Sequence, residues 1–339
     1  MKKFLLLIVV LLFSISGYSQ DAPALTDTND TKPLSFWENE YAQKKEDPSV
    51  LKAYIEKRSN LGLSNAFVFD KYLQLLPESE RTSETVVNLY VKEMRFLRVN
   101  SFAFDNLIKY KSEFEKTIGA VNFLIFTAIK NTVDDAALLK DENLLHAAMS
   151  AYDQLPQAAL PMQKDELYRT YYQQAGDKEQ YIKYTISYVN NSLMKISDDS
   201  ISQKDKENAK LIENMFKSES LSNTNSEITA KWKEQSSHME RDKIGNQLDY
   251  VAREFFDQVT DKKALKNALK WAERSLDLTP DNVQYLDTYA NLLYKLGKKK
   301  AAIEKETLAL SKVAKEDVAR YRIEDTIFKM KDGKKTWKE

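Results

Sequence analysis

Apolar and polar positions follow a helical period along almost the whole chain from Leu34 onward. One apolar stripe runs through Val50, Leu51, Tyr54 and Ile55, and similar stripes recur along the chain at steps of three or four residues. This spacing places apolar side chains on one face of an α-helix. It predicts an all-α fold of roughly fourteen helices, packed as antiparallel pairs because each helix must bury its apolar face against a neighbour.

The clearest organisation is an echo with a period of 34 residues near the C-terminus. Ala268 and Leu276 return as Ala302 and Leu310. Three further apolar positions return in kind, with Phe255, Val259 and Leu269 echoed by Tyr289, Leu293 and Ile303. This period resembles that of the tetratricopeptide repeat, a helix–turn–helix unit of about 34 residues. The resemblance implies helix pairs stacked as an irregular tetratricopeptide-like solenoid, whose groove would bind proteins. An unrelated antiparallel bundle with a chance match is the alternative.

The second of these units, which contains residues 279–314, follows the expected pattern well. Close helix crossing requires small side chains, and Ala290, Ala302 and Ala309 stand at the crossing positions. Gly297 stands at the turn between the two helices. We therefore expect Ala302 to lie where the two helices touch.

The first unit is more degenerate, because Phe256 replaces a small residue and Lys263 replaces the turn glycine. Between the units, the pair Thr279-Pro280 is typical of a helix start, with Thr as N-cap and Pro at the first helical position. We expect the first helix of the second unit to begin there and to end at Gly297.

A broader resemblance rests on the segment WAERSLDLTPDNVQYLDTYANLLYKLGKKKAAIEKETLAL, residues 271–310. It resembles the helical C-terminal region of exported Bacteroidota proteins that carry a thioredoxin domain, as does the sequence SGYSQ at residues 16–20. Those proteins place a Cys-x-x-Cys site before the helices. This chain has no Cys, so the resemblance implies the helical module without the redox activity.

The N-terminus has the features of a secretory signal peptide. Lys2 and Lys3 precede the unbroken apolar run of residues 4–13, and Gly17 and Ser19 supply small residues for cleavage. We expect export to the periplasm or the extracellular space, and no stable membrane insertion after processing. An uncleaved anchor is the alternative, whereas a lipoprotein anchor would require a Cys.

Five segments follow from these patterns. They are a signal peptide at 1–19, a flexible leader at 20–33, an N-terminal helical array at 34–196, a polar helical connection at 197–244, and tetratricopeptide-like units with a capping helix at 245–339. The connection has few aliphatic residues and many charges. It is either a hinge or a pair of exposed helices with surface loops.

Composition excludes several functions. The formal net charge is zero, whereas sequence-independent nucleic-acid binding requires a basic surplus. The two histidines, His146 and His238, lack any metal-ligand spacing, and phosphate-binding and nucleophile motifs are absent. We expect no cofactor and no metal, and a noncatalytic binding or scaffold module. The alternative is a helical hydrolase or glycan-processing enzyme with dispersed carboxylates.

The expected binding surface is the inner face of the first helices of the C-terminal units. It would take a protein or peptide ligand. Eight residues fall on this face: Tyr250, Arg253, Asp257, Gln284, Asp287, Asn291, Tyr294 and Lys295. Among them, Arg253, Asp257, Asp287, Asn291 and Tyr294 recur at one-turn spacing, so they can face one ligand together. In the tetratricopeptide resemblance, Asn291 stands where many units place an Asn that bonds a peptide backbone. A solvated helix face without any ligand is the alternative.

Overall fold

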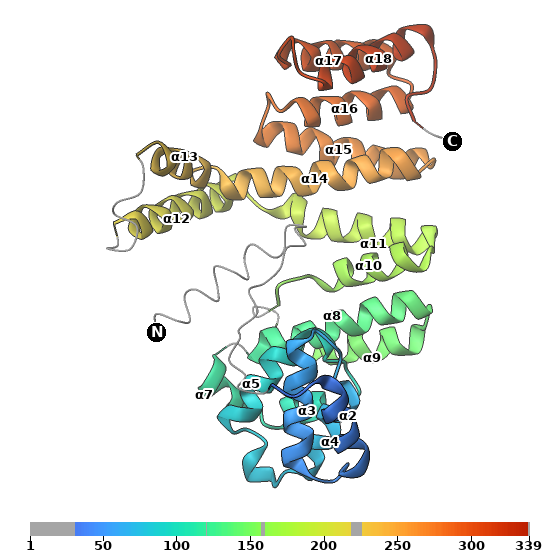
Figure 1. Cartoon of the computed structure of the whole chain (residues 1–339). Coiled ribbons are helices and arrows are strands. Elements are labelled where there is room, and N and C mark those ends of the chain that lie inside the picture. The colour runs from blue at the N-terminus through green and yellow to red at the C-terminus, as the bar shows by residue number, and fades with distance from the viewer. Residues whose placement is uncertain (1–30, 120, 157–159, 218–225, 338–339) are drawn as a thin grey trace. The chain divides into compact units, whose positions relative to one another are not determined.

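The computed structural model describes residues 31–119, 121–156, 160–217 and 226–337 (Figure 1). In these residues the chain forms α-helices joined by turns and short 3₁₀ helices, without a strand, which confirms the all-α prediction. The predicted signal peptide and residues 20–30 of the predicted leader lie outside the described residues. Among the described helices, none combines the length and apolar character that a bilayer crossing requires.

The described residues form 17 α-helices, more than the roughly fourteen that the pattern predicted. The N-terminal half accounts for part of the difference, because its helices are short. Tyr110, for example, both ends one helix and begins the next.

Two compact units share these helices, and α8 and α9 contribute to both. Unit 1 extends to Thr132 and includes His146–Pro161; unit 2 comprises Val133–Leu145 and Met162–Glu339. The sequence boundaries at residues 196 and 245 both fall inside unit 2. Unit 1 draws on helices α2 Leu34–Gln43, α3 Pro48–Asn60, α4 Ala66–Leu75, α5 Glu84–Glu93, α6 Phe102–Lys109, α7 Lys111–Ile118, α8 Val121–Leu139 and α9 Glu142–Asp153, with 3₁₀ turns η1 Glu78–Glu80 and η2 Met94–Phe96.

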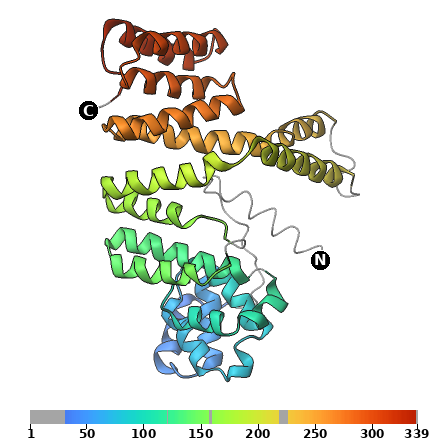
Figure 2. The same cartoon turned by 180° about the vertical axis from the view of Figure 1, so that it is seen from behind.

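Unit 2 contains the remaining helices: α10 Lys164–Ala175, α11 Lys178–Asn191, α12 Asp198–Phe216, α13 Ser226–Ser236, α14 Met239–Gln258, α15 Lys262–Leu278, α16 Val283–Lys295, α17 Lys299–Lys312 and α18 Ala319–Asp332, with the 3₁₀ turn η4 Leu193–Lys195. Helices α10 with α11, α14 with α15, and α16 with α17 pack as antiparallel pairs, and α18 covers α17 (Figures 1 and 2). The predicted pairing is thus observed.

The small residues of the 34-residue echo pack as predicted. Ala268, Ala290, Ala302 and Ala309 are all fully buried. Ala290 and Ala302 share a cluster with Leu293 of α16 and Met330 of α18, so the capping helix completes the core of the last pair.

The predicted start of α16 at Thr279-Pro280 is wrong. Thr279 instead ends α15, and the N-cap of α16 is Asn282, whose side chain accepts hydrogen bonds from the backbone N–H groups of Gln284 and Tyr285 at 2.9 and 3.2 Å. Asn caps a helix as well as Thr does. Gly297 has φ +84°, a left-handed conformation that glycine adopts without strain, and ends the helix where predicted.

The polar segment 197–244 is helical. Helices α12 and α13 pack together, and the buried Asp205 of α12 accepts hydrogen bonds from the backbone N–H groups of Glu240 and Arg241 at 2.7 and 3.4 Å. Asp205 thereby fixes α12 to the first turn of α14. Ser197 caps α12 through the N–H of Ser200, at 3.2 Å.

Candidate functional site

The eight predicted binding residues lie on α14 and α16, the first helices of the last two pairs. We use the name first-helix face for the sides of α14 and α16 that carry these eight residues, together with Arg322 of α18, which contacts Asp287. Tyr250, Asp257 and Gln284 are exposed on it, Arg253, Tyr294 and Lys295 are partly exposed, and Asp287 and Asn291 are buried.

Asp287 is the centre of this face. Its carboxylate accepts a hydrogen bond from the guanidinium of Arg322 at 2.5 Å and lies 3.9 Å from that of Arg253. Asn291 donates its amide N–H groups to the backbone oxygen and the carboxylate of Asp287, at 2.9 and 3.0 Å. Three helices therefore meet at one buried carboxylate, and the face brings together three of the eight predicted residues, Arg253, Asp287 and Asn291.

These contacts change the role expected of Asn291. The side chain is only 7% exposed, and both of its recorded amide donations go to Asp287. In this arrangement Asn291 helps to hold the Asp287 carboxylate in position beneath the exposed side chains.

A second buried acid, Asp249 of α14, extends the network. Gln284 donates its side-chain amide N–H to the Asp249 carboxylate at 2.7 Å, and the guanidinium of Arg253 lies 3.8 Å from the same carboxylate. Arg253 also donates to the hydroxyl of Thr288 at 3.1 Å. Because Arg253 contacts residues on both helices, it fixes α14 against α16 while keeping 39% of its side chain exposed.

Glu306 of α17 lies beneath the same network and is fully buried. Its carboxyl group lies against the carboxylate of Asp287 and, when protonated, donates a hydrogen bond to it. Burial, reinforced by the negative charge of Asp287, raises the pKa of Glu306 to about 10. The side chain is therefore a neutral acid at pH 7, which avoids a second buried negative charge beside Asp287.

Glu254 connects α14 to the preceding helix pair. Its carboxylate accepts hydrogen bonds from the guanidinium of Arg169, from Gln173 at 2.6 Å and from the hydroxyl of Tyr181 at 3.1 Å. Arg169 and Glu254 are each about one-tenth exposed, with side-chain exposures of 11% and 10%. A buried ion pair thus joins α10 to α14, within unit 2.

At the other end of the face, Tyr294 and Lys295 contact Trp337 from the C-terminal end of the described chain. The rings of Tyr294 and Trp337 are 6.2 Å apart, and the ammonium group of Lys295 lies 5.3 Å from the Trp337 ring. Lys295 also donates to the backbone oxygen of Phe256, and burial lowers the pKa of its ammonium group.

Sequence reasoning missed seven residues that lie on this face or contact its residues: Arg169, Asp249, Glu254, Thr288, Glu306, Arg322 and Trp337. Asp249 and Arg322 could have been found from spacing, because Asp249 to Gln284 and Asp287 to Arg322 are both 35 residues apart, close to the echo period. Glu306 and Trp337 carry no such signal, since many charged or aromatic residues of the chain are placed like them.

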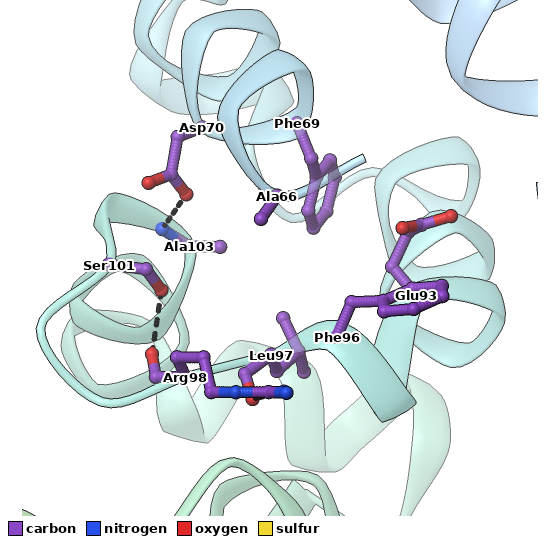
Figure 3. Close-up of a pocket in the computed structure, with 9 residues that line it drawn as sticks. All are labelled: Ala66, Phe69, Asp70, Glu93, Phe96, Leu97, Arg98, Ser101 and Ala103. Atoms are coloured by element: carbon purple, nitrogen blue, oxygen red, sulfur yellow. Dashed lines mark hydrogen bonds between the residues drawn. The ribbon is translucent and has the colours of Figure 1, made fainter. Parts of the chain in front are cut away.

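Two hollows lie in unit 1. One, of about 30 Å³, lies between α4, η2 and α6, where Asp70 accepts a hydrogen bond from the N–H of Ala103 at 2.8 Å (Figure 3). It has room for about one water molecule. The other, of about 380 Å³, lies between α6 and α9. Its charged residues Asp105 and Lys109 are exposed, and Lys109 pairs with Glu78 at 2.9 Å.

Metal-ligand clusters of three or more His, Cys, Asp or Glu side chains are absent from the described residues. His146 is exposed on α9, and His238 lies 2.5 Å from Asp242 at the start of α14. Comparison of the sequence with protein-family models and with curated proteins finds no match. Function is therefore inferred from the first-helix face itself.

Proposed function

We propose that this chain is an exported, noncatalytic binding protein that holds a segment of another protein on the first-helix face. The observation that carries the proposal is the combination of a fixed base with exposed side chains above it. Asp249, Asp287 and Asn291 are buried and hydrogen-bonded. Over Asp287, the Arg322 side chain is 52% exposed. Further along the same face, Tyr250 of α14 is 58% exposed beside Glu254.

Such an arrangement suits peptide binding for two physical reasons. Tyrosine and arginine contribute strongly to protein interfaces, because each combines a large contact area with hydrogen-bond donors. The base also holds Arg253 and Arg322 in place before a partner arrives, so less conformational entropy is lost on binding. Arginine carries hydrogen-bond donors and no acceptor, so both side chains suit a partner segment that offers acceptor groups, such as backbone carbonyls or carboxylates.

The proposal of export rests on the features of residues 1–19. These are the charged start, the apolar run and the small residues of a cleavage site. The hydrolase alternative would need two carboxyl groups that reach a substrate. The adjacent acids Asp287 and Glu306 are 4% and 0% exposed, and Asp249 is 0% exposed, so the exposed Asp257 is left without a second accessible carboxyl group among these acids. We therefore favour binding over hydrolysis at this surface.

Site-specific photo-cross-linking tests the proposal. A photoreactive amino acid at position 250 should cross-link a partner in cells that express the chain. The matched control is position 308 on α17, where Leu308 is 40% exposed on a second helix. We expect at least tenfold more of the partner adduct from position 250. Equal yields from the two positions, or none from either, would mean that the partner binds elsewhere, and the aromatic-rich N-terminal half would then be tested next.

A further inference from the structure

The end of the described chain occupies part of the first-helix face. After α18 ends at Asp332, residues 333–337, which we call the C-terminal tail, bring Trp337 against Phe256 of α14 and Tyr294 of α16. The Trp337 ring packs edge-on at 6.2 Å from both Phe256 and Tyr294, with interplanar angles of 84° and 61°. Lys295 lies 5.3 Å from the same ring. We call Phe256, Tyr294 and Lys295 the Trp seat.

The Trp seat has the composition of a receptor for an aromatic side chain. It offers two aromatic rings for edge-to-face contact and a cation at the ring face. Lys295 is held there by donating to the Phe256 backbone oxygen. Asp257 is exposed next to Phe256, and its charge acts on Lys295. This negative charge favours a positively charged residue in an occupant of the seat. In the tail, Lys334 precedes Trp337 but pairs with Asp332 at 2.7 Å and lies over the Phe328 ring at 5.5 Å.

The tail fits this seat imperfectly. The hydroxyl of Thr336, next to Trp337, is buried without a hydrogen-bond partner. A buried unsatisfied hydroxyl opposes binding, because it loses its bonds to water and gains none. A short tether offsets this defect, since only Gly333 and three further residues separate α18 from Trp337 and keep its effective concentration high.

We propose that the Trp seat is a binding site for an extended peptide that carries an aromatic residue beside lysines, and that the C-terminal tail is its displaceable occupant within the chain. A partner segment of this chemistry takes the place of Trp337. The inference rests on the proposed function in treating α14 and α16 as the binding face.

A labelled peptide of residues 331–339, KDGKKTWKE, is the probe, and fluorescence anisotropy measures its binding to the full chain. The Trp337→Ala variant should bind the peptide at least tenfold more tightly than the unmodified chain, because its seat is empty. Trp337→Phe should give an intermediate affinity, because Phe still occupies the seat. The matched control is Trp232→Ala, on α13 and 36% exposed, which should bind no more tightly than the unmodified chain.

Peptide variants make the test specific. Replacing the peptide's Trp with Ala should abolish binding, and replacing its Thr with Val should tighten binding, because the unsatisfied hydroxyl is removed. Adding Tyr294→Ala to Trp337→Ala should lower the affinity at least fivefold. Equal affinities of Trp337→Ala, Trp337→Phe and the unmodified chain, or binding that ignores the peptide's Trp, would overturn the inference. Either result would leave the cross-link at position 250 unaffected, so the two proposals fail separately.

Discussion

Glu306 is the residue whose charge state most affects the first-helix face. When Glu306 is protonated, the charges of this network balance. The two negative charges are those of Asp249 and Asp287, and the two positive charges are those of Arg253 and Arg322. An ionised Glu306 would add an unpaired charge in a fully buried position, which is costly. Its pKa, raised to about 10 by burial and by Asp287, keeps the balance at neutral pH.

This raised pKa predicts a dependence of stability on pH. Between the ordinary pKa of 4.5 and the folded value of about 10, the folded chain holds a proton that the unfolded chain has lost. The contribution of Glu306 to stability is therefore most favourable below pH 4.5 and falls as the pH rises, by at most about 1.4 kcal/mol per pH unit.

Glu306→Gln removes this dependence, because the amide is neutral at every pH. Its free energy of unfolding relative to the unmodified chain should therefore rise steadily from pH 5 to pH 8 in urea denaturation. Glu304→Gln, at an exposed position of the same helix, is the control and should show no such trend. Parallel pH profiles for Glu306→Gln and the unmodified chain would mean that Glu306 is charged in the folded protein.

At the scale of single helices, the start of α16 allows a direct test of capping. Asn282→Ala removes two side-chain hydrogen bonds to the first turn and should destabilise the fold by about 1 kcal/mol. Thr279→Ala should change stability by less than about 0.5 kcal/mol, because Thr279 caps nothing and its hydroxyl is unsatisfied. Thermal unfolding of both variants decides the matter. A larger loss of stability for Thr279→Ala than for Asn282→Ala would mean that α16 begins at Thr279-Pro280.

The crossing of α16 and α17 allows a test of packing. Ala302 is fully buried beside Ala290, whereas Ala301 is only partly buried. Ala302→Phe should therefore lower the free energy of unfolding by about 1–3 kcal/mol through overpacking, and Ala301→Phe by less. Equal melting temperatures would show that the 34-residue alignment places the wrong face of α17 in the core.

The helices were predictable because their pattern depends on local spacing, whereas their polar contacts depend on which helices become neighbours. The sequence echo was visible only after residue 255, yet hydrogen bonds in unit 1 also join residues about one period apart. Ser59 donates to Glu93, 34 residues on, and the N–H of Val99 donates to Thr132, 33 residues on. The regularity lies in helix packing, which many different side chains satisfy, so sequence alone shows it weakly in unit 1.

The site was predictable only in part for a related reason. Helical spacing placed Arg253, Asp287 and Asn291 on one face correctly, but it could not show how deep each would lie. Asn291 is buried and donates both amide hydrogens to Asp287, which in turn accepts from Arg322 of α18, a helix that the spacing did not place there. The contact of Trp337 with Tyr294 depends on the path of the chain after Gly333, which no periodic pattern describes.

At the scale of the whole molecule, the proposed export predicts a defined mature N-terminus. Mass spectrometry of the protein recovered from outside the cytoplasm should place it within two residues of Gln20, because Gly17 and Ser19 supply the small residues of a cleavage site. Changing Ser19 to Arg should block cleavage and leave the precursor associated with the membrane. Recovery of intact Met1 from unmodified chains in the membrane fraction would reject the signal peptide.

Glu254 is one of the contacts that join α14 to the preceding helix pair. Its carboxylate accepts hydrogen bonds from Arg169, Gln173 and Tyr181, beside the apolar core that these helices share. Glu254→Ala leaves the Arg169 charge buried without its partner, which should cost about 3–5 kcal/mol. Because the loss falls on the junction between helix pairs, the pair α10–α11 should separate first, and urea unfolding should broaden into two steps. The double variant Arg169→Met with Glu254→Leu removes both charges and should recover at least half of the lost stability, because neither side chain is then left charged and unpaired. If the double variant is as unstable as Glu254→Ala alone, the junction depends on the shape of Glu254 and not on its charge.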